Sequence, residues 1–287
     1  TDGNTNWGSS AGTNMGNSEW VVFDQDTFDY LGSHGELPEI EGCMDEAAAN
    51  YDPNASIPCD PDCCQYSSAI TIHDIQYSND IGSGEYDCYP SPYGTFGNEQ
   101  YVTTSGFITA VKSGSNPNFY IQDSNFDTYA GVYVYDNTQN PVLGDEVTFT
   151  ALVTEYYGLT ELQDVEDYTV LSSGNNTITY KNISTGDLAN GCTDTGESLE
   201  GMLVRVSNVT VTQGVIDEYL EWYVDDESGE CQIDDSMFDG QWPEPAVGQQ
   251  YDNITGVVDY GFGKFGILPR TMIDINQNDD QPVADAG

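Results

Sequence analysis

Cysteines are concentrated in one short segment between residues 42 and 66, which also carries five acidic side chains. Four of the seven cysteines of the chain lie there. The sequence has no repeated CxxC pair of the kind that holds zinc. The segment therefore predicts disulfides, and its side-chain oxygens could hold Ca²⁺, which takes about six to eight oxygen ligands in flexible geometry. The alternative is a disulfide-stapled loop with solvated acidic groups, because the DxDxDG sequence of a calcium loop is absent. The candidate calcium ligands are Asp45, Asp52, Asn54, Asp60 and Asp62.

Aromatic side chains, which make up 12% of the chain, are the second group that could bind a ligand. Small barrels hold single-stranded nucleic acids by stacking bases on aromatic side chains in a cationic groove. The competing interpretation is that aromatic residues alternating along a strand form core or cross-strand pairs. Trp222, Trp242 and tyrosine-rich loops also permit carbohydrate binding. The possible aromatic ligand face consists of Phe119, Tyr133, Tyr135, Tyr156 and Tyr157.

The sequence offers no catalytic arrangement. Its two histidines, His34 and His73, lie in different segments, so that no Ser-His-Asp or Cys-His set is indicated. Carboxylates are so abundant that any pair of them is weak evidence for hydrolytic chemistry. We therefore assign no catalytic residues and expect that the chain is not an enzyme.

The charge of the chain is strongly unbalanced, because 49 Asp and Glu against 5 Lys and Arg give a formal net charge of −44. Such a chain repels nucleic-acid phosphates and anionic membrane surfaces, since binding to either needs clustered cations. This argues against a nucleic-acid partner, and the lack of a long apolar run argues against membrane insertion. We expect most acidic groups to form a solvated surface suited to salty water. The cations are Lys112, Lys181, Arg205, Lys264 and Arg270.

Short strands must position these side chains. Five segments separated by Gly, Asn and Pro turns predict one small barrel, and they lie at 70–76, 101–111, 118–123, 131–136 and 147–158. Five later blocks repeat, in the same order, the stretches at 102–111, 119–123, 132–136, 143–145 and 151–158; they lie at 204–211, 222–226, 231–235, 247–249 and 254–261. Because a conserved order of blocks is typical of a tandem repeat, we predict an all-β fold with two small barrels.

The motifs of the first repeat resemble a known family. F-Y-I-Q-D at 119–123, G-V-Y-V-Y-D at 131–136 and E-Y-Y-G-L-T-E-L at 155–162 are similar to OB-fold domains attached to secreted bacterial nucleases and other exported proteins. The resemblance covers about residues 70–275, with G-F-G at 261–263 replacing the Y-Y-G corner in the second repeat. It implies that both barrels are OB-like. It also implies an alternative function, as an accessory module of a secreted nuclease or other hydrolase with weak nucleic-acid or glycan binding.

Two segments before the barrels resemble other modules of secreted Bacteroidota proteins. SEWVVFDQDTFDYLGSH at 18–34 is similar to the closing strand and tail of lamin-tail-like domains. GCMDEAAANYDPNASIPCDPDCCQY at 42–66 is similar to repeats related to thrombospondin type 3 calcium repeats. In that pattern Cys43 and Cys64 occupy the outer cysteine positions, whereas Cys59 and Cys63 are additional.

The remaining cysteines predict a disulfide within the second barrel. A bridge between Cys192 and Cys231 would pin the connector to the barrel wall, and Cys88 is then expected to pair with Cys59 or Cys63. The odd number of cysteines leaves one thiol free, or paired outside the chain. Disulfides imply an oxidising compartment, and hence a secreted or cell-surface protein.

We therefore expect a non-catalytic extracellular structural or adhesive module, part of a cell surface or filament, stabilised by disulfides and Ca²⁺. It would belong to a larger secreted bacterial protein, since both ends of the chain look cut. Its expected partners are other domains of the same polypeptide and neighbouring subunits joined by strand addition. The predicted parts are a lamin-tail-like segment (1–40), a Cys-rich acidic segment (41–68), the first barrel (69–172), the second barrel (173–276) and a linker into a following domain (277–287).

Overall fold

A computed structural model describes the chain from residue 39 to residue 277, with short gaps. The lamin-tail-like segment, except for its last two residues, and the linker after residue 277 lie outside the described residues. Among the described residues, no helix is long and apolar enough to cross a membrane. The gaps lie at 46–47, 49–50, 60–62, 65–67, 85, 113–117, 175–178, 216–219 and 239–244.

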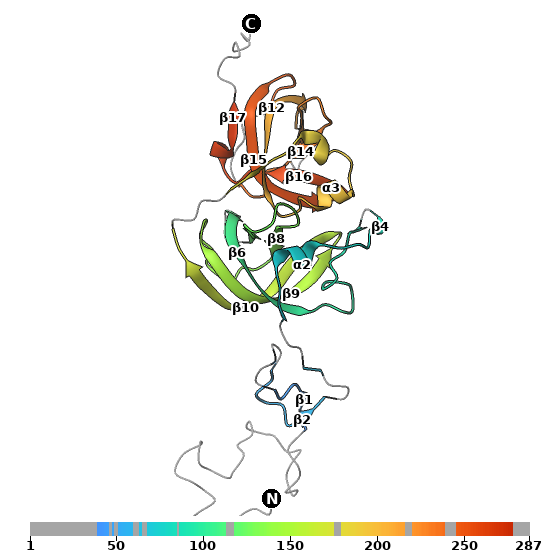
Figure 1. Cartoon of the computed structure of the whole chain (residues 1–287), viewed down its shortest axis with the longest axis vertical. Helices are drawn as coiled ribbons and strands as arrows, with labels where there is room; N and C mark the ends of the chain where they lie inside the picture. Colours follow the sequence, from blue (N-terminus) through green and yellow to red (C-terminus); the bar gives the residue numbers. More distant parts are fainter. Residues whose placement is uncertain are drawn as a thin grey trace, which may run out of the picture.

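The first barrel is a closed ring of five strands (Figure 1). The strand order is β6-β7-β8-β10-β9, and β6 pairs with β9 to close the ring. All neighbours are antiparallel except β8 and β10, which run parallel. This ring confirms the prediction of an OB-like barrel. Its strands are β6 (Tyr101–Val111), β7 (Phe119–Gln122), β8 (Gly131–Val134), β9 (Glu146–Tyr156) and β10 (Leu159–Ser172).

The second barrel repeats this arrangement. Its ring has the order β12-β13-β14-β16-β15, closed by pairing of β12 with β15, and again only β14 and β16 are parallel. The order of blocks in the sequence therefore predicted the tandem architecture correctly. The strands are β12 (Leu203–Gln213), β13 (Trp222–Asp225), β14 (Cys231–Ile233), β15 (Gln250–Gly261) and β16 (Lys264–Leu268).

Short elements lie around the rings and in the cysteine-rich segment. In that segment β1 (Glu41–Gly42) pairs with β2 (Ile57–Pro58). Three strands extend the barrel sheets, namely β3 (Ser68–Ala69), β11 (Lys181–Asn182) and β17 (Ile275–Gln277). The others are α2 (Ile72–Gln76), β4 (Gly82–Gly84), β5 (Asp87–Cys88), η1 (Thr185–Asp187), α3 (Asp194–Glu197) and η2 (Met272–Asp274).

The strand predicted at 70–76 is wrong, because this segment forms α2. The hydroxyl of Thr71 accepts from the backbone N–H of Asp74, whose carboxylate accepts in return from the backbone N–H of Thr71. This capping box satisfies two free donors of the first turn. Ile72 and Ile75, three residues apart, both point into the core of the first barrel. The fifth strand of that barrel is instead β10.

Equivalent tight hairpins join the last two strands of each ring. Tyr157 and Gly158 both have positive φ between β9 and β10, and Phe262 and Gly263 do so between β15 and β16. Two-residue loops with positive φ at both positions match the right-handed twist of the flanking strands. The G-F-G sequence therefore replaces the Y-Y-G corner in structure as well as in sequence.

Disulfides in the structure correct part of the predicted pairing. Cys43 pairs with Cys64, as the repeat pattern implies, and Cys59 pairs with Cys63. The predicted Cys192–Cys231 bridge and the pairing of Cys88 with Cys59 or Cys63 are wrong, because Cys192 is bonded to Cys88 in the first barrel's half of the chain. The thiol of Cys231 is free and fully buried on β14, where the core of the second barrel encloses it.

We predict that removing the Cys88–Cys192 bridge destabilises the barrels strongly. The two residues are 104 positions apart, and closing a loop of that size is worth about 4 to 5 kcal/mol in the chain-entropy model. The double variant Cys88→Ser/Cys192→Ser should therefore lose free energy of unfolding of that order in a denaturant titration. Cys59→Ser/Cys63→Ser is the control, because its bridge lies outside the barrels. An equal loss in both double variants would contradict the prediction.

Candidate functional site at the junction of the two barrels

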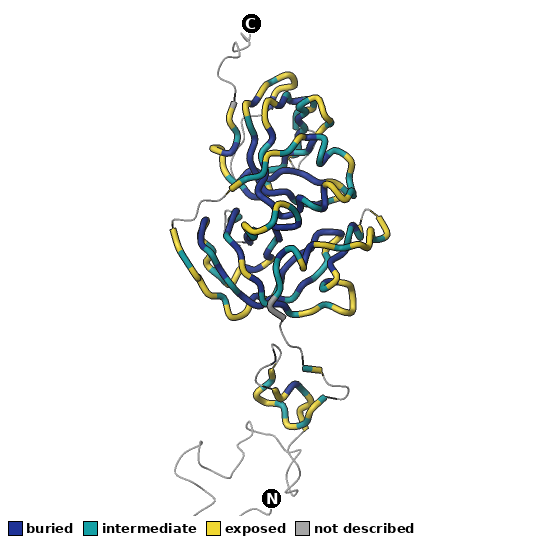
Figure 2. The backbone as a smooth tube through the Cα atoms, in the orientation of Figure 1, coloured by how far each residue is buried: buried dark blue, intermediate teal, exposed yellow. Residues whose placement is uncertain are grey.

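The two barrels share buried apolar surface at a junction. Cys88, Ala130 and Leu159 precede the second barrel in the chain but belong to its core cluster. A smaller cluster joins Ala110 and Tyr120 to side chains of the second barrel. Figure 2 shows that buried residues lie on both sides of this junction. Because burying apolar area drives association, the shared core holds the two rings together.

Two glycines permit the close approach of the barrels. A Cβ on Gly131, at the start of β8, would collide with the backbone of Gly201, and a Cβ on Gly201 would collide with Gly131. Gly201 also has a φ of +69°, which side chains other than glycine rarely tolerate. At this point of the junction, backbone therefore packs directly against backbone.

Both backbone and side-chain groups form hydrogen bonds across the junction. The backbone N–H of Tyr129 donates to the carbonyl of Ser198 over 2.7 Å. The backbone N–H of Leu203 donates to Oε1 of Gln122 over 2.8 Å. Since each of these donors would otherwise be buried without a partner, the bonds fix the relative position of the rings.

Glu200 is the most deeply buried carboxyl group at the junction, with 1% of its surface exposed. It lies in the turn that follows α3, and its Oε1 accepts from the backbone N–H of Thr160 over 3.1 Å. The amide of Gln76, on α2, donates to the same oxygen over 3.4 Å. Burial and the neighbouring Glu155 raise the pKa of Glu200 well above its ordinary value.

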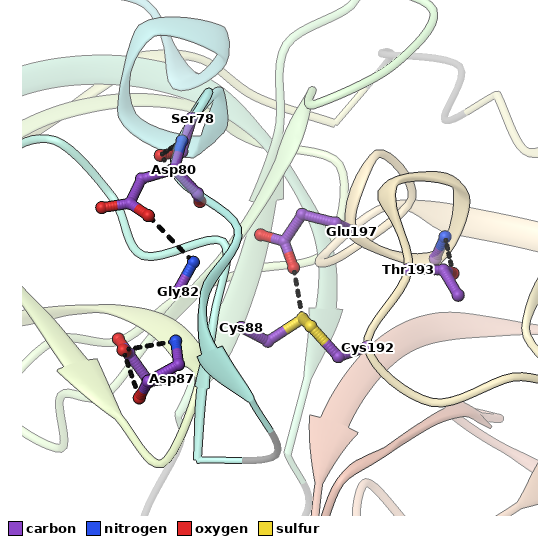
Figure 3. The surroundings of a disulfide bond; sticks show 10 residues. Ser78, Asp80, Gly82, Asp87, Cys88, Cys192, Thr193 and Glu197 are labelled. Atoms are coloured by element: carbon purple, nitrogen blue, oxygen red, sulfur yellow. Dashed lines mark hydrogen bonds between the residues drawn. A yellow bond between two sulfur atoms is a disulfide. The ribbon is translucent and has the colours of Figure 1, made fainter.

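Glu197 lies at the end of α3, beside the inter-barrel disulfide (Figure 3). Its Oε2 is 3.6 Å from Sγ of Cys88. Burial raises its pKa to about 11, and the nearby Glu200 contributes further because two carboxylates cannot both ionise at short range. Thr193 caps α3 through its side chain, which accepts from the backbone N–H of Gly196. The cap holds the carboxyl group against the sulfur.

Glu155 and Asp259 are two further carboxyl groups with raised pKa. Glu155, on β9, accepts through Oε1 from the backbone N–H of Ser91 and the hydroxyl of Thr160, at 2.7 and 2.8 Å. Desolvation nevertheless raises its pKa to about 7. Asp259, on β15, accepts from the hydroxyl of Tyr120 over 2.7 Å, and burial raises its pKa to about 7 as well.

These carboxyl groups can hold protons and donate hydrogen bonds inside the protein. Burial raises the pKa of Glu197 to about 11 and the pKa values of Glu155 and Asp259 to about 7, and it raises the pKa of Glu200 well above its ordinary value. Asp259 also lines an open pocket of about 400 Å³ on the second barrel, together with Asp234. Perturbed carboxyl groups next to a disulfide are the chemically distinctive part of this molecule.

The predicted aromatic face is not one surface. Phe119 was predicted on it wrongly, because its side chain is fully buried in the first core. Tyr133 is half-buried, and its hydroxyl accepts from the amide of Asn118 over 2.8 Å. Tyr156 and Tyr157 are exposed and touch each other edge to face at 4.8 Å. Tyr135 is also exposed, but it lines a separate pocket.

The predicted calcium ligands lie partly outside the described residues, since Asp60 and Asp62 fall in a gap. Of the others, Asp52 accepts through Oδ1 from the backbone N–H and the side-chain amide of Asn54, at 2.8 and 3.2 Å. The backbone carbonyl of Asp45 lies 3.8 Å from Sγ of Cys43. Within the described part of the chain, no three His, Cys, Asp or Glu side chains are grouped for a metal. Calcium binding therefore stays a prediction.

Most of the cations have structural partners. Arg205 lies 3.7 Å above the ring of Tyr180, and Arg270 forms an ion pair with Asp274 at 2.7 Å. The ammonium group of Lys264 donates to the hydroxyl of Tyr223, and that of Lys181 donates to the backbone carbonyl of Asp127. Arg205 and Arg270 line one pocket, but Tyr180 and Asp274 already contact their guanidinium groups.

Sequence reasoning missed the carboxyl groups of the junction. Glu155 and Glu200 lie in motifs that resemble OB-fold domains, but among 49 acidic residues nothing in their spacing distinguishes them. One signal was available, because Glu200 precedes a glycine in a stretch of apolar residues, Leu199 to Val204. A charged residue inside such a stretch indicates burial with a partner.

Comparisons with known proteins find similarity over part of the chain and assign no function. Residues 169–278, less than half of the chain, match a family model described as "Domain of unknown function (DUF8508)". No curated protein matches the chain in sequence. Among solved structures, an Ifi202 HINa domain in complex with 20-bp double-stranded DNA matches at 13% identity and a TM-score of 0.29, over 58% of this chain and 90% of that one. A murine DNA-binding protein bound to double-stranded DNA matches at 10% identity and a TM-score of 0.29, over 59% and 92%. At such values the DNA binding of those proteins is not transferred to this chain.

We predict that the protein becomes less stable as pH rises from about 5 to 8. The pKa of Glu155 is about 7 in the folded protein against an ordinary 4.5, so the folded state binds this proton more tightly than the unfolded state. Its stabilising effect is complete below the unfolded pKa and disappears as pH rises through the folded pKa. The loss from this group alone is about 2 to 3 kcal/mol.

The variant Glu155→Gln tests this pH dependence. Oε2 of Glu155 is buried without a hydrogen-bond partner among the described residues, so an amide can occupy the place of the protonated acid. Denaturant titrations at pH 5 and pH 8 should show a smaller difference in free energy of unfolding for the variant, by about 2 kcal/mol. Glu166→Gln, an exposed position on β10, should keep the wild-type difference. A Glu155→Gln variant with the full wild-type pH dependence would show that other groups cause it.

Proposed function

We propose that this chain is a non-catalytic structural module of an extracellular protein, in which the two barrels act as one rigid spacer. The observation that carries the proposal is the junction, where a shared core and the Cys88–Cys192 bridge join the rings. Independent domains usually meet through smaller and more polar contacts and move relative to each other. A covalent bridge and a continuous core suppress that motion.

The disulfides support an extracellular location. Three bridges lie among the described residues, and such bonds persist in oxidising compartments. We place the chain in a larger secreted protein of the cell surface or of a filament, as the resemblance to modules of secreted Bacteroidota proteins implies. An adhesive role of the whole protein, with partners in other domains or in neighbouring subunits joined by strand addition, belongs to the same proposal.

A second candidate function is that of an accessory module of a secreted hydrolase. The exposed rings of Tyr86, Tyr156 and Tyr157 favour it, because they form a row that could contact a glycan. The ring centroid of Tyr157 lies 5.8 Å from that of Tyr86 and 4.8 Å from that of Tyr156. The net charge of −44 and the scattered cations disfavour a nucleic acid as its ligand. The junction supports the rigid spacer more directly, and we rank that function first.

We predict that the bridge shields the first barrel from a pulling force. Cys88 and Cys192 flank all five strands of that ring, so force applied at the two chain ends passes through the disulfide. In single-molecule stretching, the oxidised chain should not release the residues between the two cysteines. The reduced chain should release roughly 370 Å more, from about 3.6 Å per residue over a separation of 104 residues.

Cys88→Ser/Cys192→Ser provides the control for this experiment, since it should extend fully without reductant. Release of the full length by the oxidised wild-type chain would contradict the rigid spacer, because the first barrel would then bear the load. Cys59→Ser/Cys63→Ser should behave as the wild type.

We further propose that the cysteine-rich segment binds Ca²⁺ through the predicted ligands. Asp52→Asn tests this, because the variant keeps the side-chain acceptor used by Asn54 but removes the negative charge. Calorimetric titration after EDTA treatment should show weaker Ca²⁺ binding in the variant, by about tenfold. Asp123→Asn is a matched control, since Asp123 accepts the same two hydrogen bonds from Asn125 at 2.8 and 2.7 Å. Equal affinity in all three proteins would remove Asp52 from the site.

A further inference from the structure

We infer that the Cys88–Cys192 bridge is a thiol–disulfide exchange site, at which Glu197 supplies the proton to the departing sulfur of Cys88. The inference stands on the position of three groups at the junction (Figure 3). Oε2 of Glu197 lies 3.6 Å from Sγ of Cys88, and the two residues come from different halves of the chain. The bridge is therefore placed between a buried acid and the partly exposed connector that carries Cys192.

The exposure of the two sulfurs sets the direction of attack. Cys88 is 1% exposed, enclosed by the core that it shares with the second barrel. Cys192 is half-buried in the connector before α3. Cys192 is thus the more exposed of the two residues, and we place the attack of a thiolate at its sulfur rather than at that of Cys88. Exchange requires in-line access to one sulfur and a departing group at the other.

The reductant is a dithiol, and the exchange proceeds in two steps. Its thiolate forms a bond to Sγ of Cys192 while the Cys88–Cys192 bond breaks and the electron pair passes to Sγ of Cys88. That sulfur takes the proton of Glu197, which becomes a carboxylate. The second thiol of the reductant, once deprotonated, then attacks the mixed disulfide and releases Cys192 as a thiolate. The two protons that the dithiol gives up pass through water to the Cys192 thiolate and the Glu197 carboxylate, so that the reductant ends as a disulfide and the protein as two thiols.

A proton donor matters at this position because a thiolate would be poorly solvated there. Burial and the nearby carboxyl groups disfavour a negative charge on the departing sulfur of Cys88. A departing thiol with a high pKa leaves slowly. Glu197 removes this obstacle because burial and its neighbours Glu200, Glu155 and Asp194 keep it protonated. Its carboxyl group faces the bridge from α3, only five residues after Cys192, so the cysteine and its acid are carried by one short segment.

The rate of reduction tests the inference in the full-length oxidised protein. Dithiothreitol would be added at constant pH, samples quenched with an alkylating reagent, and each bridge quantified by peptide mass spectrometry. We expect Glu197→Gln to slow the loss of the Cys88–Cys192 bridge by at least about tenfold, since a positioned general acid commonly contributes about 10²-fold or more. Reduction of the Cys43–Cys64 bridge in the same sample should keep its rate.

Glu161→Gln is the matched control. Like Glu197, Glu161 is a buried glutamate, but it lies on the first barrel and its partner is the amide of Gln163. It should leave the rate of reduction unchanged. An unchanged rate in Glu197→Gln would overturn the proposed role of this residue, and so would an equal slowing in the control.

A second measurement needs no substitution. The wild-type protein treated briefly with 2-mercaptoethanol should carry the mixed disulfide on Cys192, with Cys88 as the free thiol. A mixed disulfide found mainly on Cys88 would overturn the direction of attack. Neither result depends on the proposed spacer function, which the stretching experiment tests separately.

Discussion

The contact of Gly131 with Gly201 is the constraint on which the rest of the structure depends. Because neither residue has a side chain, the backbones of the two rings meet directly, and water is excluded from the surrounding surface. Side chains from both halves of the chain then share one core. Glu197 and Glu200 lose their solvent for the same reason, and without that loss their pKa values would not rise. Dense packing and unusual carboxyl chemistry are thus two results of one close approach.

The sequence was sufficient for the architecture because repeats and turns are local signals. The blocks around Tyr120 and Tyr223 recur in order, and the hairpin corners at Gly158 and Gly263 follow from residues that tolerate positive φ. The helix α2 was missed because Ile70 and Ile72 alternate as in a strand, whereas only Ile75, three residues after Ile72, indicates a helical face. The decisive capping box depends on the neighbouring Asp74.

The junction could not be predicted in this way, because it depends on how two separately folded rings dock. The Cys192–Cys231 pairing assumed that a cysteine finds its partner in its own barrel. In the structure Cys231 points into the core of that barrel, while the connector carrying Cys192 passes Cys88 with a Cα–Cα distance of 5.6 Å. Only that docking decides which thiols come within bonding distance. The roles of Glu155 and Glu200 were hidden for the same reason.

Buried carboxyl groups also make the junction specific. An apolar surface of similar size could pack in several registers, since the hydrophobic effect has no direction. Oε1 of Glu200 accepts from the backbone N–H of Thr160 and from Gln76, so a shift of either ring would break both bonds and leave the N–H of Thr160 buried without this partner. The arrangement that forms these bonds also sets Glu197 against Cys88. The register that makes the two barrels rigid is therefore the register that gives the disulfide its acid.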